Sequence, residues 1–472
     1  MLVYVFILSL LGQTVYCTEY WKLFFQTNLD EMEDIPISFD KPLPQWLKGT
    51  LIRNGLGRFE VGNQKFLNAL DAFGKLASWK FKGDGQAYFS TKIIHSVCYN
   101  QSVAMNSIAP YLMLDSVQPP WSIAKKLESL KNGPDNMNVN IKNFGGDDND
   151  FVVVSDYWNL YTVDPYTLDT LKSVRPDLPD GPDKGSAIVL SSAHPLPEYG
   201  TDNHISFVTH SAILPFEKNV MTLERIKSSS ERETIAKIEL TKASYMHSFA
   251  VTENYAVLVA MPFYVDPIGV LKNFKPLDAF KWEEHDNTTL YVVDLKTGKT
   301  RILETENLFF LHIVNAYESE IFKNQIIIDM CTYKDTRNMH SFDFSVLENA
   351  TARAQSPEPV LKRITVDIFE GQANVQPHSS KSNISFANNF DFPTINENFR
   401  SKHHCFTYGV VYNVDKTDFL HTAIVKKDLC QGINERVWVP PGKYLSEAYF
   451  VPAPDGIEED DGILMLPVFD PF

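Results

Sequence analysis

A chain of 472 residues, 44% hydrophobic and 22% charged, can bury a sizeable core in one large repeat-built domain or in two to three ordinary ones. Its 43 Lys and Arg residues against 59 Asp and Glu residues give a formal charge of −16, and no basic cluster stands out. These values argue against general disorder and against a nucleic-acid partner.

The first 17 residues have the pattern of a secretory signal peptide. An apolar stretch at residues 2–11 is followed by small or tolerated residues at Val15 and Cys17, and it is too short for a membrane span. We predict a signal peptide at 1–17 and a single domain at 18–472, secreted or held in an endomembrane lumen. N-x-S/T sequons agree with this location; they begin at Asn100, Asn287, Asn349 and Asn383.

Four cysteines remain after the leader: Cys98, Cys331, Cys405 and Cys430. An even number in an oxidising compartment permits two disulfides, but buried free thiols explain them equally well. No CxxC motif occurs, so a structural zinc site has no support.

From residue 45 onward the chain consists of short apolar or alternating runs separated by Gly, Pro, Asn and Asp. Helical periodicity is scarce, and its best instance is at 122–131. Such evenly spread strands favour an all-β propeller or a large sandwich over alternating strands and helices, although no exact repeat chooses between them. The predicted strands lie at 151–155, 160–163, 205–209, 255–261, 289–295, 325–331, 364–368, 406–414, 423–426, 436–439 and 462–469.

Three of the twelve histidines stand beside apolar strand sequence. His194 lies in SSAHP after residues 187–190, His247 lies in YMHSF before residues 255–261, and His312 lies in FLHIVNAYE. Intervals of 53 and 65 residues would place each on a different propeller blade, where inner strands converge on the axis. Converging neutral imidazoles without a carboxylate ligand favour Fe(II), Cu or Zn over Mg or Ca. We therefore predict that these three histidines bind a metal.

These motifs, in this order, resemble the histidine motifs of the carotenoid cleavage oxygenase family. The run PQWLKGTLIRNGLGRF at 44–59 is similar to the family's opening signature. DFPTIN at 391–396, SE at 446–447 and EDDG at 459–462 fall where the family has later landmarks. The resemblance extends from about residue 35 to the end.

The resemblance implies a seven-bladed β-propeller with an axial iron(II) held by four histidines. The family cleaves a carbon–carbon double bond of a carotenoid or apocarotenoid with O2 to give two carbonyl products, and one branch isomerises and hydrolyses a retinyl ester. By position, the carboxylates that hold the imidazole N–H groups are Asp156, Asp391 and Glu447. The family has Glu at all three positions, so the two shorter Asp side chains are expected to reach their histidines only through water or with a shifted backbone.

Three departures from the family pattern bear on activity. The family's fourth histidine follows the DDG motif, and here the sequence ends at Phe472 without one, which predicts an incomplete last blade. NALDA at 68–72 keeps only Asp71 of an HWFDG-like block, and Leu56 replaces the usual Pro. We expect either a truncated gene model or a divergent relative, and the alternative function is a catalytically inactive secreted propeller that binds an apolar isoprenoid.

Residues 261–280 interleave apolar side chains with Lys272 and Lys275. They lie between the second and third histidine motifs, where family members often carry an apolar entrance patch. The resemblance thus predicts a peripheral membrane contact here, and the alternative is an ordinary packed loop.

Overall fold

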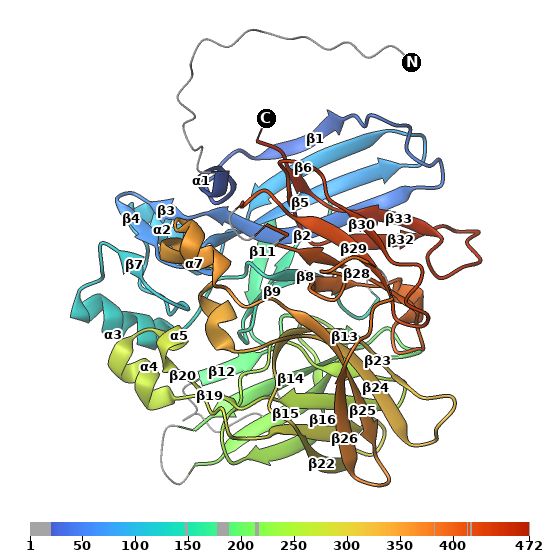
Figure 1. The fold of residues 1–472 in the computed structure, drawn as a ribbon. Coiled ribbons are helices and arrows are strands. Elements are labelled where there is room, and N and C mark those ends of the chain that lie inside the picture. Colours follow the sequence, from blue (N-terminus) through green and yellow to red (C-terminus); the bar gives the residue numbers. More distant parts are fainter. Residues whose placement is uncertain are drawn as a thin grey trace.

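A computed structural model describes residues 20–146, 150–176, 188–212, 217–381, 383–412, 414–415 and 418–471. The predicted signal peptide at 1–17 lies outside the described residues. The architecture is the all-β, seven-bladed propeller that the resemblance implies, with few and short helices (Figure 1).

The first three blades are antiparallel sheets of four or five strands. The first blade holds β1 (Met32–Ile37), β6 (Ala87–Ile93), β5 (Phe73–Lys82) and β2 (Lys48–Arg58). The second holds β11 (Thr170–Val174), β10 (Leu160–Val163), β9 (Phe151–Val154) and β8 (Asn140–Asn143). The third holds β12 (Ile188–Ser191), β14 (His204–Ser211), β15 (Asn219–Ile226) and β16 (Arg232–Leu240), with β13 (Leu196–Pro197) beside β14.

The next three blades have four strands each. The fourth holds β17 (Ala250–Val251), β18 (Tyr255–Ala260), β21 (Thr288–Asp294) and β22 (Thr300–Thr305). The fifth holds β23 (Phe309–Glu318), β24 (Gln325–Tyr333), β25 (Val360–Asp367) and β26 (Gln372–Pro377). The sixth holds β27 (Asp391–Thr394), β28 (Phe406–Val411), β29 (Ala423–Asp428) and β30 (Arg436–Trp438).

The last blade is built from two strand pairs within the described residues. They are β31 (Tyr444–Leu445) with β34 (Val468–Phe469), and β32 (Tyr449–Pro452) with β33 (Gly462–Met465). The pair β32–β33 packs against the first blade, because Val451, Ile463 and Met465 join the apolar cluster around Phe81.

The inner strands that carry the site are the strands at one edge of each sheet. β2 contacts β8, and β23 contacts both β17 and β27, so these edge strands are neighbours around the axis. Their blades pack through apolar faces such as YAVLVA in β18, whose last five residues are all buried. Strands buried on both faces are apolar without alternation, which is why the sequence shows continuous apolar runs here.

Short helices and strands lie outside the blades. Helix α3 (Ile123–Asn132) confirms the predicted helix, and the Ser122 side chain caps it. The remaining helices are α1 (Tyr20–Phe24), α2 (Val97–Met105), α4 (Pro267–Asn273), α5 (Pro276–Ala279), α6 (Phe344–Leu347) and α7 (Ala350–Ala354), with 3-10 turns at Ala69–Asp71, Thr336–His340 and Glu397–Phe399. Small sheets pair β3 (Glu60–Val61), β4 (Gln64–Phe66) and β7 (Val117–Gln118), and β19 (Phe263–Val265) with β20 (Phe280–Trp282). None of the described helices has the length and apolarity to cross a membrane.

The sequence left disulfides and buried free thiols open for the four cysteines, and the structure shows one pair of each kind. Cys405 and Cys430 form a disulfide across the β28–β29 hairpin, whereas Cys98 and Cys331 are buried free thiols.

Candidate metal centre

The three predicted histidines meet on the inner side of the third, fourth and fifth blades. His194 follows β12, His247 precedes β17, and His312 lies within β23. One ligand atom of each lies within 4.8 Å of the others, and the Nε2 atoms of His194 and His247 are 2.9 Å apart. That separation is close to the one expected for two nitrogens bound about 2.1 Å from one ion at a right angle. The structure therefore brings together the residues that the sequence predicted.

Two serines fix the histidine segments to one another. The Ser192 Oγ accepts from the His194 N–H (3.0 Å) and donates to the carbonyl of His247 (2.8 Å). The Ser248 Oγ donates to the Leu311 carbonyl (2.6 Å) and accepts from the Ile313 N–H (3.2 Å), on either side of His312. Both serines lie inside the predicted motifs, but sequence reasoning gave them no role because their partners belong to other blades.

Asp156 and Asp391 each orient one histidine. The His247 Nδ1 lies 2.8 Å from the Asp156 Oδ2, and the His312 Nδ1 lies 2.8 Å from the Asp391 Oδ1. An ionised carboxylate only accepts hydrogen bonds, so Nδ1 carries the hydrogen and Nε2 keeps its lone pair. Both imidazoles are thus held in the tautomer that offers Nε2 to a metal.

The expectation of a water-mediated contact is wrong for both Asp residues, since each reaches its histidine directly. At Asp391 the strand is irregular. The β27–β28 register shifts between Asp391 and Thr394, and Phe392 has a left-handed backbone (φ 53°) with its N–H bonded to the Asp391 Oδ1. Positive φ is uncommon for a residue other than glycine, so the chain leaves regular strand geometry where Asp391 meets His312.

The structure does not bring Glu447 to a histidine among the described residues. Its carboxylate pairs instead with Arg53 of β2 (2.5 Å), between the last blade and the first. NALDA at 68–72 is structural: buried Asp71 accepts from the N–H groups of Leu114 and Asp115, and burial raises the pKa of Asp71 to about 7.

The surroundings of His194 and of His312 shift the pKa values of these two imidazoles in opposite directions. Burial, together with His247, His312 and Lys142, lowers the pKa of His194 well below its ordinary value, so this imidazole is neutral. Burial alone would lower the pKa of His312, but Asp391, Glu447 and Asp156 outweigh burial and raise it. The same three carboxylates would stabilise a metal dication bound to His312.

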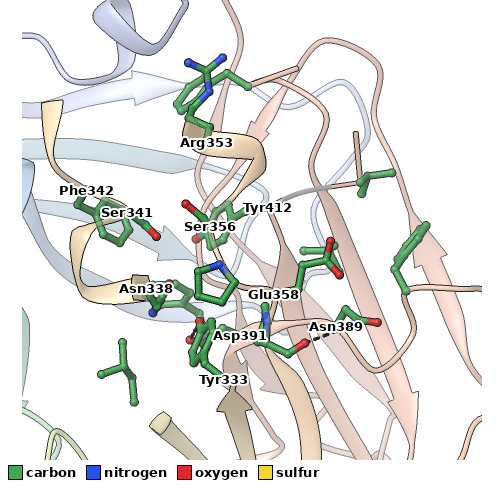
Figure 2. Close-up of a pocket in the computed structure, with 18 of the residues that line it drawn as sticks. Tyr333, Asn338, Ser341, Phe342, Arg353, Ser356, Glu358, Asn389, Asp391 and Tyr412 are labelled. Atoms are coloured by element: carbon green, nitrogen blue, oxygen red, sulfur yellow. Dashed lines mark hydrogen bonds between the residues drawn. The ribbon is translucent and has the colours of Figure 1, made fainter. Parts of the chain in front are cut away.

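A cavity of about 390 Å³ adjoins the centre, because Asp391 and Phe392 line it. Figure 2 shows Asp391 among the residues around this cavity. The Phe392 ring lies 4.9 Å from the His312 ring and 5.6 Å from the Tyr412 ring. The aromatic wall of the cavity is formed by Tyr333, Phe342, Phe386, Phe392, Tyr412, Phe419 and Tyr444. Sequence reasoning missed this wall, apart from the DFP motif, because its residues come from segments far apart in the chain.

A second group, His403, Cys405 and Cys430, also lies within 4.8 Å. Its two sulfurs are joined in the disulfide, so they offer no thiolate to a metal.

Comparisons with known proteins show which family shares this chain's sequence and fold. The family model described as retinal pigment epithelial membrane protein matches residues 25–471. The chain is 24% identical to beta,beta-carotene 15,15'-dioxygenase of Gallus gallus over 93% of this chain and 89% of that protein. It is 25% identical to carotenoid isomerooxygenase of Galleria mellonella over 90% of this chain and 82% of that protein.

Solved structures show the same fold. A mutant of Synechocystis apocarotenoid oxygenase matches with a TM-score of 0.78 and 21% identity over 97% of this chain and 91% of that chain. A cobalt-substituted form of the same enzyme matches with a TM-score of 0.79 and 21% identity over 95% and 90% of the two chains. The chain belongs to the carotenoid oxygenase and retinal pigment epithelial membrane protein family.

Proposed function

We propose that the protein is a non-haem iron(II)-dependent oxygenase that cleaves a C=C bond of a carotenoid or apocarotenoid with O2 to give two carbonyl products. The observation that carries this proposal is the convergence of His194, His247 and His312, each from a different blade, beside an aromatic cavity. The names of the curated relatives, which are carotenoid dioxygenases and a carotenoid isomerooxygenase, support the same reaction class.

The donor set fits a borderline divalent metal. Three imidazoles with no carboxylate among the ligands favour iron, copper or zinc over magnesium or calcium. The solved cobalt-substituted apocarotenoid oxygenase shows that a protein of this fold can hold a transition metal. Bound iron(II) would supply the one-electron chemistry with O2 that side chains lack.

The residues of this chain would hold the metal and give the substrate an apolar surface. Asp156 and Asp391 keep the Nε2 atoms of His247 and His312 pointed at the shared position. The aromatic wall gives a polyene an apolar surface, and Phe392 joins that wall to His312. The cavity therefore supports delivery of an apolar chain to the metal.

The test is iron content and product analysis of the purified protein. We expect close to one iron per chain and two carbonyl products from an apocarotenal, and His247→Ala should abolish both. His378→Ala is the matched control, because His378 also pairs with a buried carboxylate, Asp329 (2.7 Å), but lies outside the centre.

The outcomes separate this function from the alternatives. Iron content unchanged by His247→Ala would contradict the assignment. Binding of the polyene without turnover, with iron and O2 present, would favour the inactive propeller, for which no comparison gives support. An isomerised retinol in place of two carbonyl products would indicate isomerohydrolase chemistry.

We further propose a peripheral membrane contact and a lumenal or secreted location. Ile123 and Leu127 of α3 are 74% and 57% exposed, and Ile268 and Leu271 of α4 are 52% and 42% exposed. The two helices are neighbours, since the Lys126 Nζ lies 5.7 Å from the Phe274 ring (Figure 1). Exposed apolar side chains with lysines beside them suit a lipid surface.

The proposed lumenal or secreted location is supported by exposure of every predicted sequon asparagine, namely Asn100, Asn287, Asn349 and Asn383.

A further inference from the structure

The two Asp residues that orient histidines each also accept a hydrogen bond from a tyrosine. The Tyr245 hydroxyl donates to the Asp156 Oδ2 (2.7 Å), which also accepts from His247. The Tyr333 hydroxyl donates to the Oδ2 of Asp391, and the Oδ1 of the same carboxylate accepts from His312. The same Tyr–Asp–His chain therefore occurs twice around one centre.

The two tyrosines come from unrelated positions in the fold. Tyr245 precedes His247 by two residues, its N–H bonds to the Phe263 carbonyl (2.8 Å), and its ring packs against Phe280 (5.2 Å). Tyr333 ends β24, the strand paired with the His312 strand, and Figure 2 shows it beside Asp391. The repeated arrangement is thus not a consequence of one local motif.

Both hydroxyls face carboxylate oxygens, and a carboxylate has no hydrogen to donate. A protonated phenol can only fix a carboxylate by donating to it.

The shorter carboxylates explain why such a donor is useful. An Asp that reaches an imidazole directly must keep one side-chain orientation, and a buried carboxylate oxygen without a donor is costly. We propose that Tyr245 and Tyr333 are positioning residues of the metal centre, each holding its Asp in the orientation that fixes the imidazole Nε2 toward the metal. This inference rests on the proposed metal site.

The different exposure of the two carboxylates predicts that Tyr333 contributes more to metal binding than Tyr245 does. The Asp391 side chain is 2% exposed, and without Tyr333 its carboxylate would keep the Phe392 N–H and the weakly donating Cys331 thiol beside the His312 imidazole. The Asp156 side chain is 18% exposed, so water can replace the Tyr245 hydroxyl in part. Glu447 has Arg53 in place of both tyrosine and histidine, so it takes no part in this pattern.

The test is a titration of the metal-free full-length protein with Co(II), without substrate. The dissociation constant and the visible ligand-field absorption are measured for wild type, Tyr333→Phe and Tyr245→Phe. We expect Tyr333→Phe to weaken Co(II) binding about tenfold and Tyr245→Phe about threefold, with a shifted spectrum, because loss of a group behind a metal ligand loosens that ligand.

Tyr161→Phe is the matched control. Tyr161 donates to the buried Asp135 Oδ1 (2.7 Å), and no described histidine bonds to that carboxylate. The variant loses the same type of hydrogen bond and should bind Co(II) within about twofold of wild type with an unchanged spectrum.

The inference is overturned if both centre variants match Tyr161→Phe in affinity and spectrum. If Tyr333→Phe does not fold, Tyr245→Phe decides by the same two readouts. A wild-type protein that binds no Co(II) would instead overturn the proposed function, and this inference with it, so the two failures are distinguishable.

Discussion

The residues of the centre are held by partners distant in sequence. The contact between Asp391 and His312 spans 79 residues, and the contact between Asp156 and His247 spans 91 residues. Such contacts keep the imidazole rings fixed before a metal binds, so little reorganisation is needed on binding.

Asp391→Ala tests whether the carboxylate fixes the His312 ring for metal binding. Without the carboxylate the His312 ring can rotate and its Nδ1 hydrogen loses its acceptor, so we expect Co(II) affinity to fall about 10- to 100-fold. Isothermal titration of the metal-free protein measures the change. Asp329→Ala is the control, because Asp329 is equally buried and bonds to His378 and Arg363 outside the centre. Equal losses of affinity in the two variants would contradict a specific role for Asp391.

Sequence patterns identified the histidines and the carboxylates but not their supports. His194, His247 and His312 stand in recognisable motifs, and Asp156 and Asp391 follow from the family's order of landmarks. Tyr333 stands in no recognised motif, and Ser248 stands in one without a predicted role, because what each does depends on which strands become neighbours. Glu447 was predicted to hold a histidine as well, but among the described residues its carboxylate pairs with Arg53 instead.

At the scale of elements, strand existence was predictable because blade strands are short, apolar and bounded by turns. The predicted run 160–163 is β10 without change, and 462–469 divides into β33 and β34 around Pro467. Proline removes a backbone donor from the ladder, which explains the division. The pairing of strands into blades left no trace in local pattern, since no repeat is visible.

The surface of α3 and α4 predicts a membrane contact that can be separated from folding. Ile123→Ser combined with Leu127→Ser removes exposed apolar area, and we expect vesicle binding to fall severalfold with unchanged iron content. Cosedimentation with phospholipid vesicles measures this. Ile321→Ser with Ile457→Ser is the control, because these residues are 83% and 90% exposed in other loops. Equal vesicle binding by wild type and both variants would exclude α3 as the contact.

The disulfide predicts a contribution of the β28–β29 hairpin to stability. Cys405 and Cys430 are separated by 25 residues, and opening a loop of this size costs about 2–4 kcal/mol in unfolding free energy. Urea denaturation of Cys405→Ser with Cys430→Ser should show this loss. A thiol reductant should then destabilise wild type but not the variant, and no difference between them would mean that the bond is absent or energetically neutral.

At the scale of the whole molecule, buried histidines predict loss of stability in acid. Burial lowers the pKa of His204, His210 and His404 to about 4, and Lys237 adds to the effect at His210. A folded pKa below the unfolded value near 6.5 gives stability that is present above about pH 6.5 and lost as the pH falls toward 4.

His210→Leu isolates one of these contributions. His210 is 3% exposed and neither ring nitrogen has a hydrogen-bond partner among the described residues, so leucine removes a buried titrating group. The loss of unfolding free energy between about pH 7.5 and pH 5 should shrink by about 1–2 kcal/mol relative to wild type. Urea denaturation at the two pH values measures it, with the exposed His285→Leu as control. An unchanged pH dependence in His210→Leu would show that His210 does not titrate in this range.

The closure of the ring explains why the centre needs the whole molecule. The histidines come from three successive blades, and the C-terminal strands reach back to pack on the first blade. Sequence analysis predicted this architecture only through the family resemblance, because the closing contacts join residues near opposite ends of the chain.

Whether iron binds to the three histidines is tested by a crystal structure of the iron-loaded protein with anomalous scattering recorded at the iron edge. We expect a single strong peak about 2.0–2.2 Å from the Nε2 atoms of His194, His247 and His312. Iron bound elsewhere, with these imidazoles turned away from one another, would contradict it.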